Sequence, residues 1–208
     1  TPVAGTLLAS GGREGGDGGR IETSGTELHL EDGLEVQAGS LNGEAGLWLQ
    51  DPYDYTIDDS AAAQISLTLN SGTNVTVTTT ANNSSQGATG EGSGDITVSS
   101  TITKSDGTTA ILSLEAENDI LINQAITSTG DNALGLTAKA AGKIILNDDV
   151  QISTKGGDIV LWSNTENVES GSGEHFIRLN KGVNLTSGGG KIIPVSYTHL
   201  TLPTRAVV

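Results

Sequence analysis

The chain has 208 residues, of which 35% are hydrophobic and only 3% aromatic, and its 25 acidic and 10 basic residues give a net charge of −15. This charge argues against nucleic acids and anionic membrane surfaces as partners, because both are bound through basic side chains. No stretch approaches the roughly 20 apolar residues that a membrane-spanning helix needs, and the absence of Cys excludes disulfides and thiolate metal sites.

The small number of aromatic side chains also limits the kind of core that this chain can build. Phe, Tyr and Trp supply much of the volume of a thick globular core, whereas a thin solenoid can be filled by Val, Ile, Leu and Ala. A disordered chain would lack the regularly spaced β-branched runs described below. The chain holds no Met and shows no signal-peptide pattern at its start, so we expect its natural N-terminus to lie upstream of Thr1.

The opening stretch, residues 10–19, is rich in Gly and is predicted to form a corner or a frayed end. Within it, residues 15–19 (Gly-Gly-Asp-Gly-Gly) are loosely similar to a calcium-binding repeat. That architecture needs a tandem array of short units, and only one copy is present. We therefore predict no metal site here, although scattered Asp residues at corners could bind calcium weakly through their oxygen atoms.

Two segments have the composition of surface loops. Residues 81–94 are rich in Asn, Ser, Gly and Thr and show no apolar periodicity, which predicts a loop inserted into the fold. A linker between two domains is the alternative interpretation. Residues 166–174 are predicted to form a second loop.

A short phrase recurs along the chain, in which a Gly or Asn is followed by a charged residue and then by Ile. Gly and Asn accept positive φ more readily than other residues, so the phrase indicates a tight corner that enters a strand. The three central copies, which contain Asp95, Asp119 and Lys143, are each 24 residues apart. The copies are Gly19-Arg20-Ile21, Gly94-Asp95-Ile96, Asn118-Asp119-Ile120, Gly142-Lys143-Ile144, Gly157-Asp158-Ile159 and Gly190-Lys191-Ile192.

The residues after each corner alternate between apolar and other types with a period of two, as in Ile120 and Ile122, which is typical of a strand. Further apolar residues follow later in each unit, so that one unit holds about three short strands. Such a unit repeated at a fixed period indicates a β-solenoid, whose stacked coils share a core that one coil cannot bury alone. We predict an all-β, right-handed parallel β-helix with about 24 residues per coil, in a single domain over residues 1–193.

The last residues of the chain break this pattern. Residues 195–204 read Val-Ser-Tyr-Thr-His-Leu-Thr-Leu-Pro-Thr and are similar to the translation of a sequencing adapter. We therefore interpret residues 194–208 as a non-native tail and leave them out of the fold prediction. A genuine C-terminal linker is the alternative.

One segment carries a resemblance to a known family. Residues 46–57 read Gly-Leu-Trp-Leu-Gln-Asp-Pro-Tyr-Asp-Tyr-Thr-Ile, which resembles a recurrent phrase of filamentous haemagglutinin-like adhesins. Gln50 and Tyr55 stand where that family usually has apolar residues. Residues 18–25 and 72–77 extend the resemblance, which covers roughly residues 15–193. It implies a large β-helical exoprotein that a dedicated outer-membrane transporter exports to the surface of a Gram-negative bacterium, with adhesion, biofilm or contact functions.

Two pairs of adjacent carboxylates, Asp58-Asp59 and Asp148-Asp149, are the candidates for chemistry. Hydrolysis of a glycosidic bond uses two carboxyl groups. However, adjacent residues of a strand point to opposite faces, and the Asn-Thr-Asp, Gly-His-Gly and Arg-Ile-Lys phrases of polygalacturonase-like proteins are absent. We therefore predict solvated turns at both pairs and no catalytic residues.

The His and Trp residues offer no convergent site. His29 and His175 lie far apart in the sequence and lack a nearby Cys or His at metal-binding spacing or a Ser–His–Asp context, so both are predicted at the surface. Trp48 and Trp162 could stack on sugars, although for Trp48 we favour packing over the edge of a coil. No cofactor is expected.

Together these observations predict a non-enzymatic structural and binding segment of a secreted bacterial surface adhesin. Its expected partners are glycans or proteins of host or bacterial surfaces, and the outer-membrane transporter during export. Neither nucleic acid binding nor membrane insertion is expected. The alternatives are a β-helical polysaccharide lyase or hydrolase, and a delivery stalk for a contact-dependent toxin.

Overall fold

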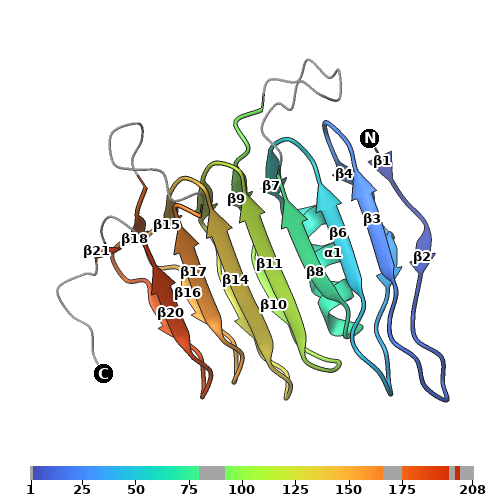
Figure 1. The fold of residues 1–208 in the computed structure, drawn as a ribbon. Coiled ribbons are helices and arrows are strands. Elements are labelled where there is room, and N and C mark those ends of the chain that lie inside the picture. The colour runs from blue at the N-terminus through green and yellow to red at the C-terminus, as the bar shows by residue number, and fades with distance from the viewer. Residues whose placement is uncertain (1, 80–91, 166–174, 197–199, 202–208) are drawn as a thin grey trace.

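The computed structural model describes residues 2–79, 92–165, 175–196 and 200–201, and almost all elements in these ranges are strands. Most strands form three parallel sheets that run side by side along a rod, and the first strands form two separate two-stranded sheets (Figure 1). The chain visits the sheets in turn and advances by one strand at each circuit, about 4.8 Å. The coil is right-handed, as parallel crossover connections nearly always are. The predicted parallel β-helix is therefore confirmed.

The largest sheet has seven strands and faces the viewer in Figure 1. In spatial order it consists of β3 (Arg20–Ser24), β6 (Leu47–Asp51), β8 (Asn74–Thr78), β11 (Ala110–Ala116), β14 (Leu134–Ala140), β17 (Ile159–Ser163) and β20 (Ile192–Val195).

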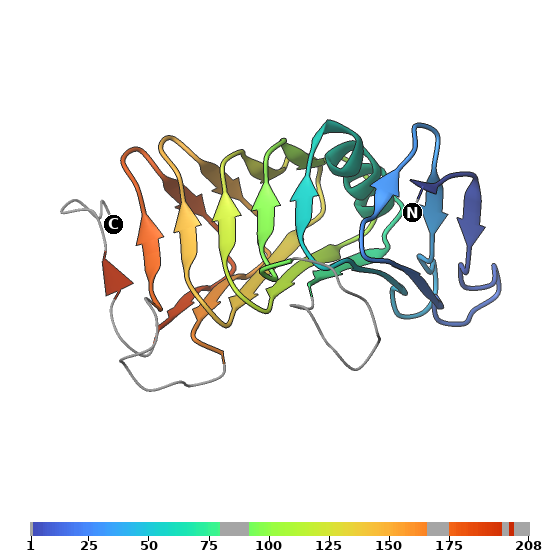
Figure 2. The same cartoon turned by 90° about the horizontal axis from the view of Figure 1, so that it is seen from above.

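Two further sheets complete the circuit, and Figure 2 looks down on the six-stranded one. The six-stranded sheet consists of β7 (Tyr55–Ile57), β9 (Ile96–Val98), β12 (Ile120–Ile122), β15 (Ile144–Leu146), β18 (Ile177–Leu179) and β21 (Leu200–Thr201). The four-stranded sheet consists of β10 (Ile102–Lys104), β13 (Ile126–Ser128), β16 (Gln151–Ser153) and β19 (Asn184–Thr186). At the N-terminal end, β1 (Pro2–Val3) pairs with β4 (His29–Leu30), and β2 (Thr6–Leu8) with β5 (Glu35–Gln37).

The strand register confirms the predicted period in the middle of the rod. Ile96 pairs with Ile120, and Ile120 with Ile144, each 24 residues further along the chain. Elsewhere the paired residues are further apart: Tyr55 pairs with Ile96 across the segment that was predicted as a loop. Differences in corner and loop length, and one helix (Asp59–Asn70) that takes the place of a strand between Tyr55 and Ile96, therefore account for the irregular spacing in the sequence.

The recurrent phrase serves two different corners. The copies with Asp95, Asp119 and Lys143 directly precede strands of the six-stranded sheet, whereas Arg20 begins β3 and Asp158 directly precedes β17, both in the seven-stranded sheet. The phrase is thus a general corner signal and does not mark one fixed position in the coil.

The core is the narrow space enclosed by the three sheets. Inward residues alternate with outward ones along each strand, so that in β14 Leu134, Leu136, Ala138 and Ala140 are buried while the residues between them are partly exposed. Most buried side chains are Ile, Leu, Val and Ala, as the composition predicted. Each coil contributes a few such residues, and burying a Leu or Ile side chain contributes about 1.5–3 kcal/mol.

One element departs from the all-β expectation. Helix α1 (Asp59–Asn70) takes the place of a strand in its coil and packs between β5 and β10 (Figures 1 and 2). Asp58 caps the helix, with its Oδ1 accepting from the backbone N of Ala61 at 3.0 Å. Ile65 and Leu69 are fully buried on its inner face. The prediction of a turn at Asp58-Asp59 was therefore wrong, because this pair begins a helix.

The predicted loops lie largely outside the described residues. Residues 166–174 fall wholly outside them, and of residues 81–94 only 92–94 are described. The flanks of the first segment are held together, because Thr79 Oγ1 donates to the carbonyl of Gly94 at 2.7 Å. Two strands reach into residues 194–208, since β20 ends at Val195 and β21 lies beyond it. Within the described ranges, α1 is too short and too polar to cross a membrane.

Candidate functional site

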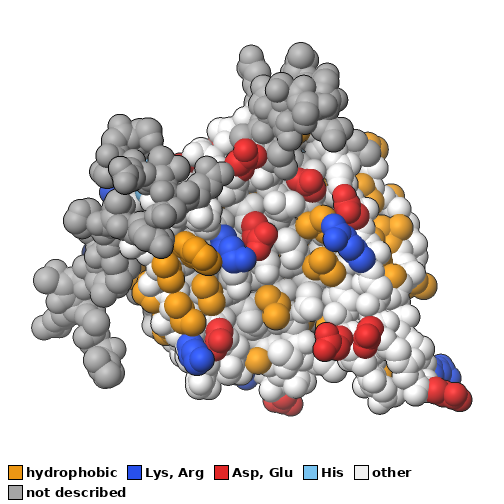
Figure 3. All heavy atoms as spheres, viewed as in Figure 1, with side chains coloured by type: hydrophobic (Ala, Val, Ile, Leu, Met, Phe, Trp, Pro, Cys, Tyr) orange, Lys and Arg blue, Asp and Glu red, His pale blue; other side chains and the backbone are white. Residues whose placement is uncertain are grey.

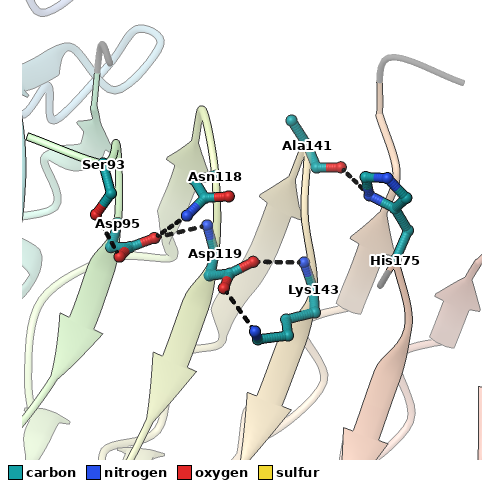
Figure 4. Close-up of polar contacts among 7 residues, drawn as sticks. All are labelled: Ser93, Asp95, Asn118, Asp119, Ala141, Lys143 and His175. Atoms are coloured by element: carbon teal, nitrogen blue, oxygen red, sulfur yellow. Dashed lines mark hydrogen bonds and ion pairs between the residues drawn. The ribbon is translucent and has the colours of Figure 1, made fainter. Parts of the chain in front are cut away.

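The first corner of the coil, between the seven-stranded and the six-stranded sheet, carries a row of charged side chains (Figure 4). Asp95 Oδ1 accepts from the backbone N of Asp119 at 3.0 Å and from Asn118 Nδ2 at 2.7 Å. In the next coil, Asp119 Oδ1 accepts from the backbone N of Lys143 at 2.9 Å, and its Oδ2 lies 3.0 Å from Lys143 Nζ. Each carboxylate therefore fastens its own coil to the following one.

The same row begins one coil earlier. Asp54 Oδ1 accepts from the backbone N atoms of Gly94 and Asp95 at 2.7 and 2.9 Å, and Oδ2 accepts from that of Ser93 at 3.2 Å. We call Asp54, Asp95, Asp119 and Lys143 the aspartate row. Hydrogen bonds to ionised acceptors are about twice as strong as neutral ones. The recurrent phrase marked Asp95, Asp119 and Lys143 as corner residues, but it did not reveal Asp54 or show that the charged residue connects one coil to the next.

The second corner, between the six-stranded and the four-stranded sheet, carries a row of Asn side chains. Asn147 Nδ2 donates to Asn123 Oδ1 at 2.5 Å, and Asn180 Nδ2 donates to Asn147 Oδ1 at 3.0 Å. Stacked Asn side chains of this kind stabilise in-register parallel strands. This Asn row was not recognised in the sequence, although Asn123 and Asn147 are 24 residues apart.

The third corner, between the four-stranded and the seven-stranded sheet, is closed by inward polar side chains that cap their own turns. Ser128 Oγ donates to the carbonyl of Asn132 at 2.9 Å, and Thr154 Oγ1 to that of Gly157 at 2.6 Å. Lys104 occupies the equivalent position one coil earlier, is 1% exposed, and donates through Nζ to the carbonyl of Asp106. Burial lowers the pKa of Lys104 from 10.5, and the charge of Asp106 offsets part of this shift.

The two carboxylate pairs lie on the same side of the rod but do not meet. Asp58-Asp59 follows β7 and Asp148-Asp149 follows β15, so both pairs lie at the second corner, three coils apart. Three strand spacings amount to roughly 14 Å, whereas the carboxyl groups of glycosidases lie about 5–9.5 Å apart. Asp148-Asp149 forms an exposed turn, as predicted, in which Asp149 has a φ of 61°.

The other candidate residues are also dispersed. His29 is exposed, whereas His175 is partly buried and its Nδ1 lies 2.9 Å from the carbonyl oxygen of Ala141 (Figure 4). Asp17, in the Gly-rich opening stretch, accepts from the backbone N of Glu44 at 2.8 Å. Among the described residues, no group of three or more His, Asp or Glu is arranged to hold a metal ion.

The two Trp residues differ in position. Trp48 is fully buried inside the coil and its Nε1 donates to Thr23 Oγ1 at 3.1 Å, so it packs in the core and not over an edge. Trp162 faces outward on β17, beside Lys139, whose Nζ lies 3.1 Å from Glu115 Oε1. Figure 3 shows this outer face, where scattered charged side chains and groups of hydrophobic side chains lie among other polar atoms.

The phrase that resembles adhesins contains two polar side chains in the core. Gln50 is fully buried and neither its Oε1 nor its Nε2 has a hydrogen-bond partner among the described residues. The hydroxyl of Tyr55 is also buried, and the described residues offer it no partner. Burial, reinforced by the charge of Asp58, raises the pKa of Tyr55. Apolar residues would suit both positions better, because a buried polar group without a hydrogen bond is costly.

No family model, no curated protein and no solved structure matches this chain.

Proposed function

We propose that this chain is a structural and binding segment of a secreted bacterial surface adhesin, without chemistry of its own. The observation that carries the proposal is that charged side chains at the corners form hydrogen bonds between adjacent coils. The acidic corner residues Asp95 and Asp119 hold adjacent coils together, and the two carboxylate pairs that were weighed for catalysis lie three coils apart. The resemblance of residues 46–57 to haemagglutinin-like adhesins supports the same function.

The rod geometry suits attachment. Parallel sheets present long, flat outer faces, on which side chains recur at the strand spacing of about 4.8 Å. Such faces offer many weak contacts that add up when several copies bind one surface. The net charge of −15 favours neutral or basic partners over polyanions.

Attachment of protein-coated beads tests the proposal. Beads carrying the full 208-residue chain should adhere to surfaces coated with mixed glycans or with cell-surface protein, and beads carrying serum albumin should not. The same preparation should release no reducing ends from pectin-like polysaccharides. Release of reducing ends without bead attachment would contradict the proposal and would favour a β-helical polysaccharide-degrading enzyme.

A further inference from the structure

A cleft of about 430 Å³ lies at the second corner, where helix α1 meets the strands of the following coils. A helix is about 10 Å across, twice the spacing of strands. We infer that the replacement of a strand by α1 produces the hollow between the start of the helix and the next two turns. The lining residues are Asp59, Ala62, Ala63, Ser99, Ser100, Thr101 and Gln124.

The walls of this cleft combine hydrogen-bonding groups with two small apolar side chains. Asp59 supplies a carboxylate, which accepts a hydrogen bond from Ser100 Oγ. Gln124 adds an amide, and Ser99 adds a second hydroxyl. The exposed methyl group of Ala63 leaves the cleft open on the helix side.

We propose that this cleft binds a neutral oligosaccharide, an inference that rests on the proposed adhesive function and names its ligand. A sugar ring presents several hydroxyls that both donate and accept, and it therefore matches a wall made of carboxylate, amide and hydroxyl groups. Its C–H groups would lie against the exposed methyl group of Ala63.

The charge of the lining residues argues against small anions and Ca²⁺ as ligands of the cleft. Among the described residues, those that line the cleft include no Lys, Arg or His, so a phosphate or uronate would meet the carboxylate of Asp59 without a compensating cation. Ca²⁺ takes six to eight oxygen ligands and usually several carboxylates, whereas Asp59 is the single acidic residue in the lining.

The position that Gln124 occupies in its coil is also polar in the next two coils. The strand register places Asp148 and then Lys181 at the equivalent position of the next two coils, directly beside the Asn row. A glycan chain longer than the cleft would therefore meet one further polar side chain per coil, at a spacing of about 4.8 Å.

Titration calorimetry on the full chain tests the proposal, with cellotetraose and maltotetraose as neutral probes and tetragalacturonate as the anionic one. We expect saturable binding of at least one neutral probe, and weaker binding of tetragalacturonate. Ala63→Arg should fill the cleft and weaken binding by at least about tenfold. Leu67→Arg is the matched control, because Leu67 is exposed one turn further along α1 and outside the lining.

A second pair of variants tests the hydrogen bonds. Gln124→Ala should weaken binding roughly three- to tenfold, the effect of losing one hydrogen bond. Gln151→Ala should leave it unchanged, since the Gln151 side chain bonds to the backbone of Asp149 and Gly182, away from the cleft. Circular dichroism of each variant checks that the fold is retained.

Three results would overturn the cleft proposal: no saturable binding of either neutral probe up to ~10 mM, equal binding by the parent chain and Ala63→Arg, or tighter binding of tetragalacturonate. In each case continued attachment of protein-coated beads would leave the adhesive function standing. Loss of bead attachment by the parent chain would instead remove that function itself.

Discussion

The aspartate row predicts how strongly adjacent coils are held together, and Asp119 is the residue at which to measure it. Asp119→Ala would leave the backbone N–H and the Nζ of Lys143 without this acceptor. A hydrogen bond to a charged group contributes about 1.5–3 kcal/mol. The ion pair adds less than about 1 kcal/mol, because Lys143 is 31% exposed and solvent screens it. We expect the free energy of unfolding to fall by about 2–3 kcal/mol.

Asp119→Asn separates the hydrogen bond from the charge. The amide oxygen of Asn can still accept from the backbone N of Lys143, so we expect a loss of only about 1 kcal/mol. Urea denaturation followed by circular dichroism gives the free energies, and hydrogen exchange at the Lys143 amide shows whether the effect is local. Asp131→Ala is the matched control, because Asp131 is an exposed acid in a turn.

The reasoning would be refuted if Asp119→Ala lowered the free energy of unfolding by no more than Asp131→Ala. It would also fail if Asp119→Asn were as destabilising as Asp119→Ala, since the backbone hydrogen bond would then contribute nothing beyond the charge.

Three further predictions concern other parts of the coil. Gln50→Leu and Tyr55→Phe each replace a buried polar group that has no hydrogen-bond partner among the described residues. Each should leave the free energy of unfolding unchanged or raise it by about 1–2 kcal/mol. A drop in the urea midpoint would contradict this. Asn147→Ala should lower the free energy of unfolding by about 1–2 kcal/mol, which is more than Asn123→Ala should. The reason is that Asn147 both donates and accepts in the Asn row, whereas Asn123 only accepts there. Equal losses of stability in urea denaturation would argue against a stabilising role of the row. Burial lowers the folded pKa of Lys104 below its unfolded value of 10.5, so just below pH 10.5 the unfolded chain binds more protons and stability rises with pH. Lys104→Met should remove this part of the rise, and identical pH profiles of stability for the variant and the parent chain would contradict it.

Helix α1 shows where local patterns were available but were not used. Asp58 as a cap, the run of three Ala residues from Ala61 and the apolar spacing of Ile65 and Leu69 are all helix signals. A solvated turn was predicted at Asp58-Asp59 instead, and no element was predicted for residues 60–70. The cleft depends on the helix, so it could not be predicted either.

The sequence alone determined the period of the coil, the alternation of buried and exposed residues and the choice of aliphatic side chains for a thin core. These properties are local: each strand buries every second residue, and each corner needs residues that tolerate unusual φ. Only the tertiary structure decided what the corner residues do. Asp95 meets the backbone of Asp119, 24 residues away, and Asp54 meets that of Asp95, 41 residues away. These partners depend on the lengths of the intervening segments, and no local sequence pattern shows which two coils are adjacent.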